Sequence, residues 1–202
     1  MDFKLSHTHR PHTLLTFLGV CAGLLTVFAC NNQGFEYNDY HPNLTIDNSK
    51  HLNTTLASSM DPMTPGVFCI ISTTIKNGVY YYCFQNNYGD VSESMFNSID
   101  QYMQSQLHMG LNNGLIVGYG NLDNPPHFYA YDLQCPNCFN PNALPLRNHT
   151  LTVSGTGIAS CKDCHREYNL NTGGNIVAGD TGTMLKPYHA SNTGPNGLLR
   201  VY

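Results

Sequence analysis

The sequence predicts a mostly β domain, and three observations lead to this fold class. Only 11% of the residues are charged, while Asn, Thr, Ser, Tyr and Gly are abundant, a composition typical of exported β proteins. Branched and aromatic residues flank Asn77-Gly78, a strong signal for a two-residue hairpin turn. From Leu111 onward the chain is rich in short strand-like segments.

The first residues predict an export signal. Lys4 and Arg10 give a positive bias, and an uninterrupted apolar run follows from Leu14 to Ala29. This run is shorter than the about 20 residues of a membrane-spanning helix and suits a secretory signal. It ends in Val27-Phe28-Ala29-Cys30, which resembles the lipobox of bacterial lipoproteins. The resemblance implies cleavage before Cys30 and lipid attachment to Cys30. The alternative is a single uncleaved anchor helix.

These features divide the chain into three parts. We expect a signal peptide over 1–29, a polar tether over 30–42 and one domain over 43–202. A lipid on Cys30 would supply durable membrane attachment. The expected location is therefore the cell envelope of a bacterium, where the exported protein is anchored to the outer membrane.

The hairpin over residues 66–86 has a predictable register. The Asn77-Gly78 turn sets Lys76 opposite Val79, so that Cys69 faces Asn86 and Cys83 faces Ser72. Cys69 and Cys83 then point to opposite faces of the sheet, and a disulfide between them would need another register. We interpret both as buried small hydrophobic residues.

Other elements follow from local patterns. One short helix is expected near 92–107, because Met95, Ile99, Tyr102, Met103 and Gln106 fall near one face and Ser92 could cap it. It is interpreted as an amphipathic helix lying on a sheet. Strands are expected at 43–47, at 66–86 as the two arms of the hairpin, and at 114–118, 128–131, 151–153, 157–159 and 198–202.

Two C-x-x-C pairs are the strongest chemical signal in the chain. They are Cys135-Pro136-Asn137-Cys138 and Cys161-Lys162-Asp163-Cys164. Two such turns at strand ends can enclose a metal ion tetrahedrally, so Cys135, Cys138, Cys161 and Cys164 are the predicted metal ligands.

The segments around these cysteines resemble a Rieske domain. Phe128 to Pro136 looks like the strand that enters the first metal loop, and Cys161 to Leu170 looks like the second loop and its following strand. Thr172-Gly173, Ala178-Gly179, Leu185 to Tyr188 and Leu198 to Val201 continue the match. The resemblance also extends to lipid-anchored bacterial proteins with altered ligands. It implies three stacked antiparallel sheets with a small metal-binding subdomain at about 132–180.

The chain departs from the Rieske pattern at both histidines. A Rieske centre takes one cysteine and one histidine from each loop. Here Asn137 stands at the first histidine position, with Cys138 next to it, and Cys164 stands at the second. His165 follows where a glycine is usual. A Rieske cluster of ordinary ligation is therefore not expected, and the family's quinol oxidation and ring hydroxylation do not carry over.

Four thiolates suit several cofactors. Zn²⁺ is favoured, because thiolates close a tetrahedron around it without redox chemistry. A 2Fe–2S cluster or a mononuclear iron is the alternative, and either could carry electrons. Disulfides within or between the loops remain a third possibility. Lys162 could temper the charge of the thiolates, although a solvated loop tip is the simpler interpretation, and His165 is interpreted as a surface residue.

The sequence favours a non-enzymatic envelope binding module over an electron carrier. The net charge is −4 and no basic patch occurs, which disfavours nucleic acid as a partner. No Ser/His/Asp arrangement and no catalytic carboxylate pair is apparent, and His149 and His127 look isolated. A thiol–disulfide oxidoreductase is disfavoured, because Pro141 and Pro145 prevent a long helix after Cys138. Any protein or small-molecule partner is unidentified.

Overall fold

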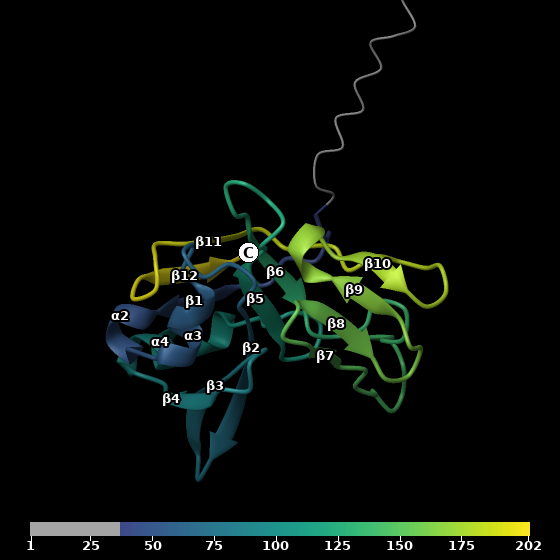
Figure 1. Cartoon of the computed structure of the whole chain (residues 1–202). Coiled ribbons are helices and arrows are strands. Elements are labelled where there is room, and N and C mark those ends of the chain that lie inside the picture. The colour runs from purple at the N-terminus through teal and green to yellow at the C-terminus, as the bar shows by residue number, and fades with distance from the viewer. Residues whose placement is uncertain (1–36) are drawn as a thin grey trace, which may run out of the picture. The chain divides into compact units, whose positions relative to one another are not determined.

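The computed structural model describes residues 37–202, which belong to one compact unit. The predicted signal peptide (1–29), the lipidation residue Cys30 and the first part of the 30–42 tether lie outside the described residues. The described chain consists mostly of three antiparallel sheets with a few short helices, which confirms the predicted fold class (Figure 1).

The largest sheet has five strands in the order β4-β3-β2-β5-β6. They are β2 (Phe68–Lys76), β3 (Val79–Asn86), β4 (Val91–Met95), β5 (Leu115–Tyr119) and β6 (Phe128–Asp132). The β2–β3 hairpin has the predicted register, with Lys76 opposite Val79 and Cys69 opposite Asn86. Asn77 and Gly78 both have positive φ, as the twist of a tight hairpin turn requires.

Two smaller sheets complete the fold. One has the order β1-β12-β11, with β1 (Leu44–Asp47), β11 (Ala190–Asn192) and β12 (Leu198–Val201). The other has the order β10-β9-β8-β7, with β7 (Leu151–Val153), β8 (Ile158–Cys161), β9 (Glu167–Asn169) and β10 (Asn175–Ala178). The turn η2 (Leu170–Thr172) connects β9 with β10.

The five-stranded sheet is the middle layer of the domain. Leu115 and Val117 of β5 belong to one hydrophobic core together with Leu199 of the three-stranded sheet. Ile116, between them, belongs to a second core together with Ala159 of the four-stranded sheet. Because successive residues of a strand point to opposite faces, the central sheet is buried on both sides, and the three sheets are stacked.

The two cysteines of the hairpin have different environments. Cys69 is fully buried, and burial raises the pKa of its thiol to about 12, so it behaves as the predicted apolar residue. The prediction that Cys83 is also buried is wrong. It is only partly buried, with its Sγ 3.8 Å from Glu93 Oε1, because it points to the face of β3 opposite to the buried Tyr82 and Phe84.

The helix predicted near 92–107 is shorter than expected. Its first part is strand β4, which pairs with β3, so Ser92 is not a cap. The helix α4 covers only Ser98–Met103, and the 3-10 turn η1 (Gln104–Gln106) follows. Asn97 begins α4 through a capping box with Asp100.

The apolar residues that suggested one buried helix face are instead exposed. Met95, Ile99, Tyr102 and Met103 have between 37% and 80% of their surface accessible. The helical spacing of these apolar residues therefore did not indicate a buried helix face. Pairing with β3 makes the first part of this segment a strand.

Two short helices lie beside α4 and were not predicted. The helix α2 (Asn48–His51) begins after Asp47, whose side chain accepts a hydrogen bond from Ser49 N–H. The helix α3 (Thr54–Ser59) begins after Asn53, whose side chain accepts one from Leu56 N–H. Such caps satisfy backbone donors that short helices leave unpaired.

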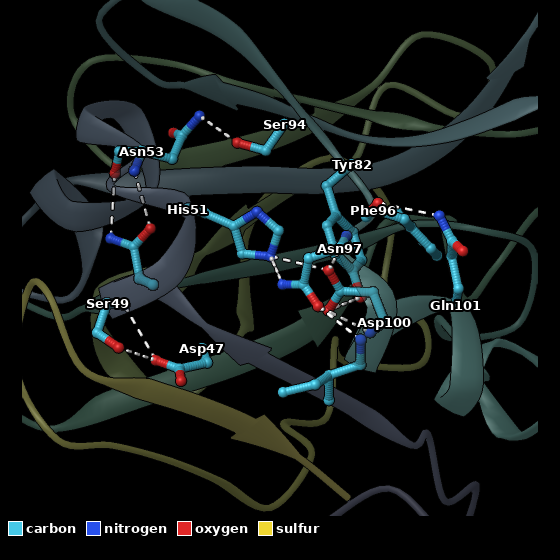
Figure 2. Close-up of polar contacts among 12 residues, drawn as sticks. Asp47, Ser49, His51, Asn53, Tyr82, Ser94, Phe96, Asn97, Asp100 and Gln101 are labelled. Carbon is cyan, nitrogen blue, oxygen red and sulfur yellow. Dashed lines mark hydrogen bonds and ion pairs between the residues drawn. The ribbon is translucent and has the colours of Figure 1, made fainter.

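A buried polar pair joins α2 to α4 (Figure 2). His51 Nε2 lies 3.1 Å from Asp100 Oδ2, and the two side chains are 4% and 5% exposed. The backbone N–H of Asn97 donates to the same carboxylate at 2.8 Å. The His51 ring also packs edge-on against Tyr82, with ring centroids 5.6 Å apart. This cluster fixes the short helices on the sheet.

We expect His51→Ala to destabilise the domain by about 1–3 kcal/mol, because the buried Asp100 carboxylate loses one of its hydrogen-bond partners. Chemical denaturation of the variant measures this loss. His41→Ala, at an exposed histidine, is the control and should change the stability by no more than about 0.5 kcal/mol. Equal stabilities for the two variants would show that the pair contributes nothing.

Candidate metal centre

The four predicted cysteines converge on one point. All four Sγ atoms lie within 4.8 Å of one another. Cys135 Sγ lies 3.7 Å from Cys164 Sγ, and Cys138 Sγ lies 3.8 Å from Cys161 Sγ. A tetrahedron of sulfurs with metal bonds of about 2.3 Å has edges of about 3.8 Å. The site could therefore hold a metal ion. Each close pair of sulfurs combines one cysteine of the first loop with one cysteine of the second loop.

The first loop continues the β6 strand. Cys135 N–H donates to His149 O at 2.8 Å, which keeps Cys135 at a strand end. The chain then turns, with Cys138 N–H and Phe139 N–H both donating to Cys135 O. This turn returns Cys138 to the side of Cys135. The backbone N–H of Asn137 also donates to the Cys135 thiol, an interaction that favours a thiolate.

The second loop is a tight turn between β8 and β9. Cys161 is the last residue of β8, and its N–H donates to Arg166 O at 3.0 Å. His165 N–H donates to Cys161 O at 2.9 Å, and His165 itself has a φ of 58°. This left-handed residue turns the chain back into β9 directly after Cys164. The loop thus presents Cys161 and Cys164 on the same side.

One short segment holds both loops in register. Leu151 of β7 pairs with Cys161 of β8. Leu151 N–H also donates to Leu133 O at 2.8 Å, two residues before Cys135. Backbone hydrogen bonds and strand pairing to residues 149–151 therefore position the two pairs of thiols.

A buried carboxylate fixes the start of the first loop. Asp132 Oδ1 accepts from Gln134 N–H at 2.7 Å, and Asp132 Oδ2 accepts from Leu111 N–H at 2.6 Å and from Tyr188 O–H at 2.7 Å. Burial raises the pKa of Asp132, although these three donors oppose the shift. The side chain ties β6 to two distant segments.

The thiols differ in burial and in acidity. Cys135 and Cys161 are buried, while Cys138 and Cys164 are partly exposed. Burial raises the pKa of Cys135 and of Cys138, and hydrogen bonds with neighbouring thiols raise that of Cys138 further. Burial also opposes ionisation of Cys164, but hydrogen bonds from the backbone and side chain of Arg166 lower its pKa to about 6. Arg166 therefore favours the thiolate form of Cys164.

Asn137 ties a third segment to the site. Its Nδ2 donates to Tyr168 Oη at 2.8 Å and to Thr183 O at 2.7 Å, and its Oδ1 accepts from Thr183 N–H at 2.9 Å. Tyr168 Oη in turn lies 3.3 Å from Cys135 Sγ. Arg166 binds the same segment through Asp180 O and Thr181 O. Residues 180–183 are thus fixed beside the sulfurs.

Sequence reasoning missed most of these surrounding groups. Lys162 is exposed, and Arg166 is the cation that contacts a ligand thiol. His165 is exposed, as predicted. His149 is not isolated, because its Nδ1 lies 2.7 Å from Asp163 Oδ2 in the second loop. The contact of His149 with Asp163 joins two separate loops and had no local signal, whereas Arg166 lies only two residues after Cys164 and its charge was the available clue.

No protein-family model matches the chain, and no curated protein matches it either. Within residues 37–202, the four cysteines are the only group of three or more potential ligands that could hold a metal ion. No helix in the described part of the chain is long and apolar enough to cross a membrane.

We expect Asn137→Ala to lower the affinity of the site for Zn²⁺ by about 10–100-fold, because residues that orient ligands contribute to affinity by this order. Competition with a chromophoric chelator measures the effect. Asn142→Ala is a matched control, since Asn142 is exposed in the loop that follows Cys138. A fall in affinity of equal size in the control would contradict a specific role for Asn137.

Proposed function

We propose that the domain is a lipid-anchored envelope module whose four cysteines hold one structural zinc ion. The convergence of four sulfurs within 4.8 Å of one another is the observation on which this rests. The binding free energy of such sites is about 10 kcal/mol or more, and it stabilises the fold directly. Here it would lock the loop that precedes β7 to the loop between β8 and β9.

The distances between the sulfurs favour a single ion. Two sulfur pairs, at 3.7 and 3.8 Å, match the edge of one tetrahedron. A 2Fe–2S cluster binds two thiolates on each of two irons, and thiolates on different irons lie farther apart than the 4.8 Å within which all four sulfurs lie here. Zinc is preferred to a single iron ion, because an ion that only stabilises the fold does not need to change its oxidation state.

A four-thiolate site has no open coordination position. Catalytic zinc sites keep one position for water or substrate, whereas structural sites are closed by protein ligands. If all four thiols bind one ion, that ion has no free position at which to activate a water molecule. This supports a non-enzymatic role, in which the metal maintains a surface for binding or assembly.

We further propose that the domain is a Rieske-like scaffold with altered ligands. Three stacked antiparallel sheets and two ligand-bearing loops support this. Asn137, at the position of the first histidine in that comparison, directs its side chain to Tyr168 and Thr183. On this proposal, an orienting amide has replaced an imidazole ligand, and Cys138 supplies the missing ligand from the next position.

The alternative function is electron transfer through iron. A mononuclear iron would accept the same four thiolates, and the partial exposure of Cys138 and Cys164 brings the site near the surface, where electrons could leave it. A 2Fe–2S cluster would require the two close pairs of thiols to lie farther from each other. Optical spectra distinguish these cases, since zinc sites are colourless and iron–thiolate sites are red or brown.

The proposed location rests on the sequence. The apolar run that ends at Cys30 supports export and lipid attachment at Cys30, which would hold the protein on a bacterial membrane, the outer membrane in our proposal.

We expect the purified protein to be colourless and to contain one zinc ion per chain. Cys161→Ser should abolish stoichiometric zinc binding and lower the melting temperature, because it removes a buried ligand. Elemental analysis and thermal denaturation measure both effects. Cys83→Ser, at a cysteine remote from the site, is the control and should retain the zinc. An iron-containing protein with visible absorbance would support the electron carrier instead.

Cys30→Ala should release the protein from the membrane fraction of the cells that produce it. Mass spectrometry of the native protein should show a mature N-terminus at Cys30 that carries acyl chains. An N-terminus without lipid, or unchanged membrane association of the variant, would contradict the proposed anchor and leave the metal site unaffected.

A further inference from the structure

The first described residues are attached to the segment that precedes β11. The Tyr37 ring stacks on His189, with ring centroids 3.8 Å apart. Asn38 N–H donates to Pro187 O at 2.8 Å. These residues fall within the predicted 30–42 tether, so the chain reaches the domain at this point and not at β1.

The same segment lies beside the metal loops. Thr183, four residues before Pro187, exchanges two hydrogen bonds with Asn137. A cavity of about 220 Å³ is lined by Asn38 and by Pro136, which is adjacent to the ligand Cys135. The point where the chain joins the domain is therefore next to the candidate metal centre.

Covalent geometry limits the distance between this point and the proposed lipid. Residues 31–36 separate Cys30 from Tyr37. A fully extended chain spans at most about 3.6 Å per residue, so the two residues can lie no more than about 25 Å apart. Because the connection between Cys30 and Tyr37 is this short, the faces of the domain near Tyr37 can reach the bilayer more easily than the opposite faces.

The surface around Tyr37 has the chemistry of a membrane interface. The rings of His189 and Tyr202 are nearly parallel, at 5.8 Å and 16°, and continue the stack that begins with Tyr37. The Arg200 guanidinium lies 6.0 Å from the Tyr202 ring. Aromatic residues with a polar group concentrate at the level of lipid headgroups, and cationic side chains are attracted to anionic lipids.

We propose that the face formed by Tyr37, His189, Tyr202 and Arg200 docks on the phospholipid surface. This face holds the metal centre close to the membrane, while the β2–β3 turn points away from it. Figure 1 shows the β2–β3 turn at the bottom of the domain and the C-terminus in its upper part, beside β11. The inference depends on the proposed lipid anchor at Cys30, and it adds an orientation that the anchor alone does not define.

Tryptophan fluorescence tests this orientation, because the chain contains no Trp. Tyr202→Trp and Ile75→Trp give one reporter at each end, at residues of similar exposure, 53% and 56%. Each lipidated full-length variant is reconstituted into phosphatidylcholine–phosphatidylglycerol vesicles, with or without brominated acyl chains. Brominated lipid should quench Y202W about twofold or more and leave I75W nearly unchanged.

Equal quenching of the two variants, or stronger quenching of I75W, would overturn the proposed orientation. Flotation of the vesicles separates this result from a failure of the anchor. A protein that floats but shows no difference in quenching contradicts the orientation alone, whereas a protein that does not float lacks the proposed anchor. If Y202W does not fold, Tyr40→Trp is the second reporter, since the Tyr40 ring lies 6.3 Å from that of Tyr188 beside His189.

Discussion

The backbone of residues 149–151 is the constraint on which the candidate metal centre depends. His149 O accepts from Cys135, Leu151 donates to Leu133, and Leu151 pairs with Cys161. One short stretch of β7 and its preceding residues therefore binds both ligand-bearing loops. Because backbone hydrogen bonds have narrow geometry, this arrangement brings the sulfurs to about the spacing of one coordination sphere. A bound ion would strengthen a geometry that the sheet already favours.

The surroundings of the sulfurs extend this constraint to a third segment. The Asn137 amide binds both Tyr168 and the backbone of Thr183, and Arg166 binds Asp180 and Thr181. Loss of the metal would thus affect residues 180–183 as well as the two loops. The proposed membrane-facing surface includes His189, six residues after Thr183. If both proposals hold, metal binding and the position of this surface are connected through residues 180–189.

Local signals in the sequence predicted the hairpin and the four cysteines that lie close together. Asn77 and Gly78 both tolerate positive φ, and this preference determines the hairpin turn. The register of β2 with β3 follows from that turn. Each C-x-x-C pair is likewise a local unit. That all four cysteines would meet was predictable, because two dithiol turns in one small domain have few other chemical uses.

Contacts between distant residues were not predictable in the same way. Nothing near Ser92 showed that β4 would pair with β3 and displace the start of the expected helix. The partners of Asn137 and of His149 lie on other strands or loops, and the pairing of His51 with Asp100 joins two short helices. Such contacts depend on the assembled tertiary structure, which local propensity does not encode.

X-ray absorption at the edge of the bound metal tests the central claim most directly. A single ion held by Cys135, Cys138, Cys161 and Cys164 predicts one shell of four sulfur neighbours at about 2.3 Å and no metal–metal scattering. Nitrogen or oxygen atoms in that shell would show that one of the four thiols is not a ligand. A metal–metal distance would show a cluster and contradict the single-ion site.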